Sequence, residues 1–298
     1  RDLGLHELAS LPVGKVSGFF DGLQLAHREA EIGRELTTEE FLAEHYEASD
    51  APTASGTSIF DPVLCEIAYR WFCPQGGTVL DPFAGGSVRG LVASRLGRRY
   101  VGIELRPEQV DANRAQLHIA ADPQPEWRVG DSRNIAALAG DVEADLIFSC
   151  PPYWNLEVYS DDPADLSTLD ADGFFSAQAE IIAAAVGRLR QDRFAVWVVG
   201  DVRDAAGFYV NMPGRTIDAF KNAGARHYND AVLLTAVGSL PIRAGKQFSS
   251  TRKLGKTHQN VLVFCKGDPR KATEAIGKVE FGALEADSQK PNKFGELL

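Results

Sequence analysis

The residues that most suggest chemistry are Ser149-Cys150-Pro151-Pro152-Tyr153-Trp154, which follow a short apolar segment. Two consecutive prolines cannot continue a strand, so they predict a rigid loop that turns outward. Carbonyl groups of such a loop can accept hydrogen bonds from an amine, and the ring of Tyr153 can stack on a planar ligand such as a nucleobase. A proline turn that only caps the strand is the plain alternative.

A second candidate is Asp81-Pro82-Phe83-Ala84-Gly85-Gly86-Ser87, a loop between a predicted strand and a predicted helix. Its glycines let the backbone approach a ligand closely, which is typical of a cofactor site. A dinucleotide site is the alternative, but the sequence has neither Gly-x-Gly-x-x-Gly nor the Gly-Lys-Ser/Thr of a phosphate-binding loop here.

Acidic residues follow the next two predicted strands. Glu104, in Gly102-Ile103-Glu104-Leu105, lies about 20 residues after the glycine loop, the spacing of an acid that accepts both ribose hydroxyls. Asp131, in Gly130-Asp131-Ser132, could accept a hydrogen bond from an adenine amine, and a helix N-cap is an equally good interpretation.

Together these motifs resemble the DNA amino-methyltransferases. Asp81 to Ser87 is similar to their S-adenosylmethionine loop, Asp-Pro-Phe-x-Gly-Ser-Gly, with Gly86 and Ser87 in the swapped order. Cys150 to Tyr153 is similar to their Asp/Asn/Ser-Pro-Pro-Tyr signature. The resemblance runs from Thr57 to Lys271 and is strongest to DNA methylases of bacteriophages and prophages.

The resemblance implies S-adenosylmethionine as cofactor, no metal, and a site-specific methylase of the restriction-modification kind. The target base is expected to flip out of the duplex and to lie against Tyr153, beside Cys150, Pro151 and Pro152. The segment before the glycine loop is expected to close over the methionine moiety. The cofactor-binding residues are predicted to be Thr57, Ser58, Ile59, Asp81, Pro82, Phe83, Ala84, Gly85, Ser87, Glu104, Leu105, Asp131 and Ser132.

Cys150 departs from the family pattern, in which Asp or Asn goes mostly with adenine and Ser mostly with cytosine. Cysteine is closest in size to serine, although its thiol is a weak hydrogen-bond partner. We therefore favour cytosine N4 slightly and leave adenine N6 open. A nucleophilic cysteine that attacks a pyrimidine ring is a third hypothesis, which the Cys-Pro-Pro order disfavours.

The net charge of -10 alone would argue against a nucleic-acid partner. Residues 238–272, however, contain eight Lys or Arg and one Asp, so this segment carries +7 and the remainder -17. A basic strip on an acidic body can hold DNA locally, and a solvated loop is the equally weighted alternative. The predicted DNA contacts are Arg243, Lys246, Arg252, Lys253 and Lys256.

Apolar strands alternate with helical segments from Ser58 onward, which predicts an α/β fold. We expect a Rossmann-like methyltransferase fold, a seven-stranded and mostly parallel sheet with an antiparallel edge hairpin. The predicted strands are Thr78–Asp81, Arg99–Glu104, Trp127–Gly130, Asp145–Ser149, Phe194–Val199, Ala231–Val237 and Asn260–Phe264. The predicted helices are Pro62–Phe72, Gly86–Leu96, Pro107–Ala120, Ala171–Leu189 and Pro213–Ala223.

The predicted organisation is a helical arm at 1–56, a catalytic domain at 57–272 with target recognition around 238–257, and a tail at 273–298. The sequence has no apolar run of about 20 residues and no signal peptide, so we expect no membrane contact. Four scattered cysteines without a Cys-x-x-Cys pair favour a reducing, cytoplasmic location in a bacterium or a phage-infected cell.

The expected partner is double-stranded DNA, and a homodimer is left open. Two rival functions remain from the sequence. One is an RNA or free-nucleotide methyltransferase of the same fold. The other is a non-catalytic DNA-binding relative, in which Cys150 marks a lost activity.

Overall fold

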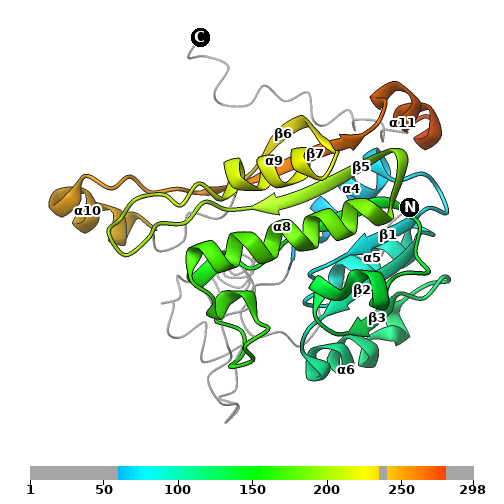
Figure 1. The fold of residues 1–298 in the computed structure, drawn as a ribbon, viewed down its shortest axis with the longest axis horizontal. Coiled ribbons are helices and arrows are strands. Elements are labelled where there is room, and N and C mark those ends of the chain that lie inside the picture. Colours follow the sequence, from blue (N-terminus) through cyan, green and yellow to red (C-terminus); the bar gives the residue numbers. More distant parts are fainter. Residues whose placement is uncertain (1–59, 157, 235–239, 280–298) are drawn as a thin grey trace, which may run out of the picture.

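The computed structural model of the chain describes residues 60–156, 158–234 and 240–279. Its strands form one seven-stranded sheet in the order β3-β2-β1-β4-β5-β7-β6 (Figure 1). Neighbours among β1 to β5 are parallel, whereas β7 is antiparallel to β5 and β6. The strands are β1 Thr78–Asp81, β2 Arg99–Glu104, β3 Glu126–Val129, β4 Ala144–Ser149, β5 Leu189–Val199, β6 Arg226–Leu234 and β7 His258–Lys266. The predicted fold class is confirmed.

Capping residues and prolines set the starts of several helices. Asp61, Asn211 and Asp268 each accept a backbone N–H at a helix start that also has proline in its first turn. The α-helices are α4 Pro62–Phe72, α5 Val88–Arg95, α6 Pro107–Ala115, α7 Ile135–Leu138, α8 Ala171–Arg188, α9 Met212–Asn222, α10 Leu240–Thr251 and α11 Pro269–Ile276. Short 3-10 turns cover Leu117–Ile119, Ser132–Asn134, Trp154–Leu156 and Leu166–Thr168.

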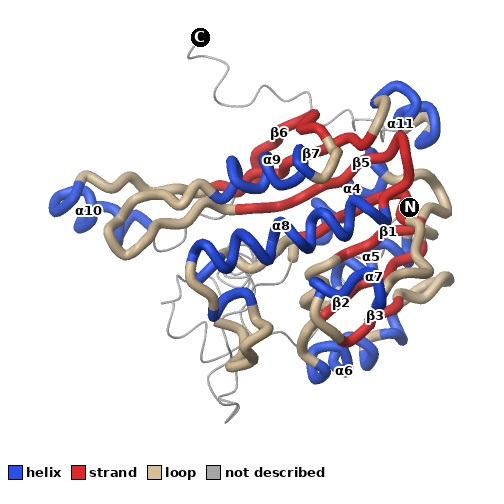
Figure 2. The backbone as a smooth tube through the Cα atoms, in the orientation of Figure 1, coloured by secondary structure: helices blue, strands red, loops and turns tan. Residues whose placement is uncertain are grey.

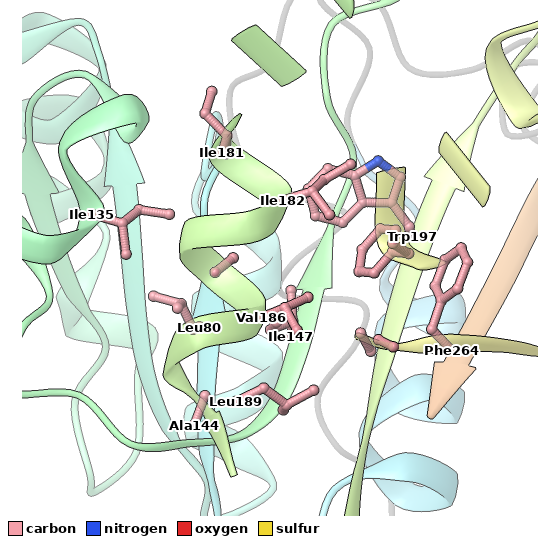
Figure 3. Packing of buried hydrophobic residues seen from close by; sticks show 14 of the residues in the cluster. Leu80, Ile135, Ala144, Ile147, Ile181, Ile182, Val186, Leu189, Trp197 and Phe264 are labelled. Atoms are coloured by element: carbon pink, nitrogen blue, oxygen red, sulfur yellow. The ribbon is translucent and has the colours of Figure 1, made fainter. Parts of the chain in front are cut away.

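The helices lie on both faces of the sheet (Figure 2). Successive strand residues point to opposite faces, so Trp197 joins the core under α8 and α9, and Val196 joins the core under α4 and α5. Figure 3 shows the first of these cores, with Ile182 of α8 close to Trp197. A sheet covered on both faces leaves its strand ends as the places where polar groups can meet a ligand.

The strand order reverses between β1 and β4, since β2 and β3 lie on one side of β1, and β4 and β5 lie on the other. In such sheets the loops after the two central strands diverge to opposite faces and leave room for a ligand between them. Residues 82–87 follow β1, and residues 150–153 follow β4. The topology therefore brings the two sequence motifs together.

The β6–β7 connection differs from the expectation. The predicted antiparallel pairing is confirmed, but helix α10 lies between the strands, where no full helix was expected. This segment contains Pro241, Gly245 and a Ser-Ser pair, whose low helix propensity hides the helix in the sequence. Figure 1 shows α10 at the end of an arm that projects from the body, beyond the carboxyl end of β6.

Helix α11 spans the predicted end of the catalytic domain. The boundary expected after residue 272 falls inside α11, and Ala272 is fully buried in the core under α4 and α5. The described fold therefore reaches Ile276. The predicted arm, residues 1–56, lies outside the described residues. No helix in the described part of the chain has the length and apolar content needed to cross a membrane.

Candidate active site

Asp81, the last residue of β1, is fully buried, and donors surround its carboxylate. One oxygen accepts hydrogen bonds from the Ser149 hydroxyl and from the backbone N–H of Phe83 (3.1 Å). The other accepts from Nε of Arg89 at 2.6 Å and from the Tyr100 hydroxyl at 2.7 Å. Four donors use the usual capacity of a carboxylate. These bonds position the loop, and a direct contact between Asp81 and the cofactor stays a prediction.

Arg89, on α5, is buried beneath the same loop. Besides its pair with Asp81, its guanidinium donates to the carbonyl groups of Phe83 and Ala84. The ring of Phe60 covers it, with 4.5 Å from Cζ to the ring centroid. Burial opposes the charge of Arg89, but the Asp81 carboxylate outweighs this effect and raises the pKa of the guanidinium. A permanent buried ion pair thus holds the loop backbone.

The two glycines of the loop leave its backbone accessible. Gly85 has a φ of +50°, a conformation that glycine adopts without strain. A Cβ added at Gly85 or Gly86 would meet no atom within 4 Å, so this part of the loop faces open space. Asn113 donates to the Gly85 carbonyl at 2.7 Å, and the Gly85 N–H donates to Glu104 at 2.9 Å. The loop can therefore be approached closely by a ligand while its shape stays fixed.

Glu104 ends β2 next to the glycines and is held from two sides. Its oxygens accept from the backbone N–H of Gly85 (2.9 Å) and of Arg106 (3.1 Å). A carboxylate has about four acceptor directions, so two remain for a pair of hydroxyls such as those of a ribose. Burial raises the pKa of Glu104, partly offset by these backbone donors. Leu105 is half-buried beside it. The donor set and the open loop fit a nucleoside cofactor.

Two serines from the predicted set brace the loop. The Ser87 hydroxyl donates to the Gln116 side chain, and the Ser132 hydroxyl donates to the Pro82 carbonyl. Both serines are buried, so their direct contact with a cofactor stays a prediction. Their bonds show that neighbouring elements, α6 and the turn after β3, set the loop conformation.

Asp131 occupies the N-cap position that the sequence left as one of two interpretations. One carboxylate oxygen accepts from the backbone N–H of Arg133 at 2.9 Å, and the other pairs with the Arg133 guanidinium at 2.6 Å. The carboxylate is thus used in the turn Ser132–Asn134. Recognition of an adenine amine by Asp131 stays a prediction.

Tyr153 lies over the end of β5. Its hydroxyl donates to Oε1 of Gln259 at 2.9 Å, and its ring lies 3.5 Å from the place that a Cβ on Gly200 would occupy. Burial raises the pKa of Tyr153 well above its usual range, so the phenol stays neutral and acts as a donor. Contacts with the ends of β5 and β7 therefore orient the ring. The neutral phenol suits Tyr153 to stacking through its ring face and not to accepting a proton as a general base.

Cys150 is oriented by the same tyrosine. Its Sγ lies 3.4 Å from the Tyr153 hydroxyl oxygen. Because the phenol proton is directed to Gln259, the thiol is the donor in this weak bond. The side chain is half-buried at the start of the loop.

The loop carries backbone strain at Trp154, whose φ of +48° is left-handed. This conformation costs an L-residue about 1–2 kcal/mol. The Trp154 indole N–H donates to the Leu169 carbonyl at 3.1 Å, and Pro151 is buried, so the surroundings hold the strained turn. Strained residues that persist in this way are typical of functional loops.

Ser149 connects the two loops. It ends β4, and its buried hydroxyl donates to Asp81 and accepts from the Phe83 N–H at 3.2 Å. The residue before Cys150 is thereby bonded to the cofactor loop. Phe83 also packs edge-on against Trp197 of β5, with ring centroids 5.8 Å apart. The two motifs therefore form one connected site at the β1/β4 reversal.

Three predicted cofactor residues, Thr57, Ser58 and Ile59, lie outside the described residues, as do the side chains of Arg243 and Lys246. The next residue, Phe60, contacts Phe148 at 5.6 Å between ring centroids in addition to covering Arg89. Phe60, which follows the predicted closing segment in the sequence, therefore packs at the site.

The basic strip is divided by β7. Arg252, Lys253 and Lys256 precede β7 at the carboxyl edge of the parallel strands, on the side of Tyr153. Lys266 ends β7 at the opposite edge, where its ammonium donates to the Val186 and Leu189 carbonyls. Arg270 and Lys271 follow it in α11. The structure thus separates the predicted DNA contacts from the remaining charge of the strip.

Four residues of the site were not identified from the sequence. They are Arg89, Tyr100, Asn113 and Gln259. A usable signal existed for Arg89, a lone charge within the otherwise small and apolar Val88–Ala93. Buried polar groups need partners, so such a charge indicates a buried ion pair. Among the described residues, no cluster of His, Cys, Asp or Glu could hold a metal ion.

The chain is similar to known DNA methylases over this half of the site. Residues 65–115 match the DNA methylase family, a range that includes the Asp81 loop and Glu104 and ends before Cys150. The Type II methyltransferase M2.DpnII of Streptococcus pneumoniae is 44% identical over 43 residues, 14% of this chain. The match spans 16% of the length of that relative.

Solved methyltransferase structures are more distant. TrmN from Thermus thermophilus is 16% identical with a TM-score of 0.47, over 70% of this chain and 49% of TrmN. A methyltransferase from Pyrococcus furiosus is 14% identical with a TM-score of 0.47, over 82% of this chain and 100% of the other. On the family match, and on the fit of the glycine loop and Glu104 to a nucleoside, the chain resembles the DNA amino-methyltransferases and its cofactor is S-adenosylmethionine.

Proposed function

We propose that this chain methylates the exocyclic amine of a base in DNA, with cytosine N4 favoured over adenine N6. The observation that supports this most is the junction of the two motifs. Ser149, which precedes the Cys-Pro-Pro-Tyr loop, is hydrogen-bonded to Asp81, which begins the cofactor loop. A methyl donor on one loop and an acceptor amine on the other would therefore be held by a single buried network.

Glu104 and the glycine loop would hold the cofactor, which supplies a methyl group on a positively charged sulfur when bound. The two unused acceptor directions of Glu104 suit the ribose hydroxyls, and the open backbone at Gly85 and Gly86 allows close approach. Thr57, Ser58 and Ile59 would cover the methionine end. The buried pair of Asp81 and Arg89 would keep this arrangement rigid.

The Cys150 loop would orient the amine. The lone pair of a base's exocyclic amine is delocalised into the ring, so the amine is a poor nucleophile in its flat form. Carbonyl oxygens of Cys150 and Pro151 can accept the amine hydrogens and direct the lone pair toward the methyl group. Tyr153 would stack on the ring of the base, and its raised pKa makes it a neutral group rather than a general base. Positioning and polarisation thus carry the rate enhancement.

The preference for cytosine rests on Cys150, whose side chain is closest in size to serine. DNA is favoured as the substrate by the family match and by the cations that precede β7 at the carboxyl edge. A base in a duplex is out of reach of this edge, so the target base would have to leave the stack. Membership of a restriction-modification system is part of the same proposal.

The test is transfer of label from tritiated S-adenosylmethionine to unmodified bacterial DNA, with total RNA as a parallel substrate. We expect label in DNA with the wild type and none with Tyr153→Ala. The variant should still bind the cofactor, since Tyr153 is not placed on that loop. Label in RNA alone would favour the rival RNA methyltransferase. Cofactor binding without transfer to either polymer would favour the non-catalytic relative.

A further inference from the structure

A tight turn after β5, from Arg203 to Tyr209, has no part in the proposed transfer step. Arg203 and Tyr209 pair as an antiparallel bridge, and the backbone N–H of Asp204 donates to the Phe208 carbonyl at 2.8 Å. The Asp204 carboxylate accepts from the Phe208 N–H at 2.9 Å, and Arg203 donates to the Gly207 carbonyl at 2.8 Å. These bonds make the turn, called the β5 turn below, a rigid projection.

The β5 turn presents two aromatic rings to solvent. Phe208 is 72% exposed and Tyr209 is 44% exposed. A single exposed apolar side chain is ordinary on a protein surface. Phe208 is less ordinary, because hydrogen bonds on both sides of the turn hold its backbone at a fixed place on the surface. Such a ring suits contact with a flat partner.

Cations surround these rings. The Arg203 guanidinium stacks on Tyr209, with 3.8 Å from Cζ to the ring centroid, and Lys256 Nζ lies 5.9 Å from the same centroid. Lys253 lies across Gly207, since a Cβ there would be 2.7 Å from its Nζ. The arm after α10 therefore contributes two lysines to a surface that begins in the β5 turn. Figure 1 shows the turn, in yellow-green, alongside this arm.

The acids of the segment are used internally. The Asp204 carboxylate caps Phe208, and the Asp201 carboxylate accepts from the backbone N–H groups of Val202 and Met212 at 3.1 and 3.0 Å. Their bonds stabilise the turn. The cations nearby outnumber them, so the surface combines positive charge with exposed aromatic faces.

The β5 turn also lies next to the catalytic loop. It begins at Arg203, three positions after Gly200, and the Tyr153 ring lies against Gly200. On the other side, Lys256 is separated by two residues from Gln259, the partner of the Tyr153 hydroxyl. Both chain segments that form the surface thus leave the sheet at Tyr153.

We infer that the β5 turn contacts DNA, with Phe208 stacked on a base beside the target nucleotide and with Arg203, Lys253 and Lys256 on the flanking phosphates. This inference rests on the proposed function, because it assumes that a strand passes Tyr153. A nucleic-acid strand offers flat apolar bases and regularly spaced anions, which match the rings and the cations. The rigid turn needs little ordering on binding, which favours affinity.

The first test measures the affinity of the full chain for an unmodified mixed-sequence duplex by fluorescence anisotropy. Phe208→Ala should weaken binding about 5- to 100-fold, the range found when a ring stacked on a base is removed. Phe208→Trp should restore it. The matched control is Tyr228→Ala, another exposed ring, which lies near the start of β6 at the opposite edge of the sheet. We expect the DNA affinity of Tyr228→Ala to equal that of the wild type. None of the three variants should change the affinity for the cofactor.

The second test uses duplex DNA with 5-iodouracil and near-ultraviolet crosslinking, followed by trypsin and mass spectrometry. We expect crosslinked nucleotide on the peptide from Asp204 to Arg215, at Phe208, and its loss in Phe208→Ala. If the wild type methylates DNA while Phe208→Ala binds as tightly and this peptide is not crosslinked, the inference is wrong and the proposed function stands. If the wild type neither binds nor methylates DNA, both are wrong.

Discussion

At the scale of single residues, the site depends on how carboxylates and a thiol are partnered. Asp81 and Glu104 both end strands next to the glycine loop, yet their environments separate their roles. Asp81 is surrounded by four donors and is fully buried, whereas Glu104 keeps unused acceptor directions beside open backbone. The same chemical group thus stabilises the loop in one case and, in the other, keeps acceptor directions that a ligand could use.

Glu104 leads to a prediction about cofactor affinity. Glu104→Gln removes charge-assisted hydrogen bonds, each worth about 1.5–3 kcal/mol, so the Kd for S-adenosylmethionine should rise roughly 10- to 100-fold. Isothermal titration calorimetry measures this. Glu108→Gln is the control, since Glu108 lies exposed on α6 one turn away. The Kd of this variant for S-adenosylmethionine should equal that of the wild type.

The pH dependence of the same affinity follows from burial. The pKa of Glu104 is raised, so on acidification its carboxylate is protonated before an ordinary glutamate would be. The protonated acid loses acceptor capacity, and the wild-type Kd should therefore increase at a higher pH than the usual glutamate range implies. Glu104→Gln should show no such transition, and a transition of equal size in the variant would show that another group causes it.

Cys150 is predicted to position and not to form a bond with the base. Cys150→Ser and Cys150→Ala should retain methylation within about tenfold, because a positioning contact is worth far less than a covalent step. The measurement is the initial rate of methyl transfer to DNA. A fall of about a thousandfold or more in both variants would instead support the nucleophilic-cysteine hypothesis.

At the scale of elements, the buried pair of Asp81 and Arg89 joins β1 to α5. Arg89→Met should cost about 3–5 kcal/mol of unfolding free energy, because it leaves the Asp81 carboxylate buried without its cation. Urea denaturation followed by circular dichroism measures the loss. Arg70→Met serves as the control, since its pair with Glu66 is 45% exposed on the arginine side and should contribute about 1 kcal/mol or less. Equal losses in the two variants would contradict the structural role of the pair.

The elements that could be predicted from the sequence were those with local signals. Helix α4 and strands β1 and β2 have the predicted ends, because Asp61-Pro62 marks a helix start and the strands are short apolar runs between turn residues. Helix α10 was missed because its residues favour loops in isolation. Strand β5 begins at Leu189 rather than Phe194, since pairing of its polar first residues is decided by β4 and β7.

The candidate site likewise combines features that have a local sequence signal with contacts that only the folded sheet defines. The order of the two motifs, each after a strand, was enough to bring them together once the sheet was assumed. The bond between Ser149 and Asp81 joins residues 68 positions apart, and the bond between Tyr153 and Gln259 joins residues 106 apart. No local pattern encodes such pairs. They depend on the register of β4 and β7 against β1 and β5, which only the assembled sheet defines.

At the scale of the whole molecule, an acidic body carries its predicted DNA contacts at one end. The carboxyl edge of the sheet holds the glycine loop, the Cys150 loop, the β5 turn and the lysines before β7. The opposite edge holds Lys266 and α11. Under the proposed function, a net charge of -10 would direct DNA toward a small part of the surface, because the rest of the body would repel it.

This arrangement predicts where DNA affinity depends on salt. The triple variant Arg252→Gln, Lys253→Gln and Lys256→Gln should lower the slope of log K against log salt by about 3, because each substitution leaves one phosphate without its cation. The measurement is duplex affinity over a series of potassium chloride concentrations. Arg270→Gln with Lys271→Gln, at the opposite edge, should leave the slope unchanged. A similar decrease in both variants would show that the slope depends on the net charge of the chain and not on where the cations lie.

Above all, the proposed function requires that the methyl group goes to an exocyclic amine in DNA. Mass spectrometry of nucleosides tests this directly, after reaction of unmodified duplex DNA with the wild-type chain and deuterated S-adenosylmethionine. We expect deuterium in N4-methylcytosine or N6-methyladenine, and none with Tyr153→Ala. Label in 5-methylcytosine, or no methylated nucleoside from a chain that binds both cofactor and DNA, would contradict the proposed function.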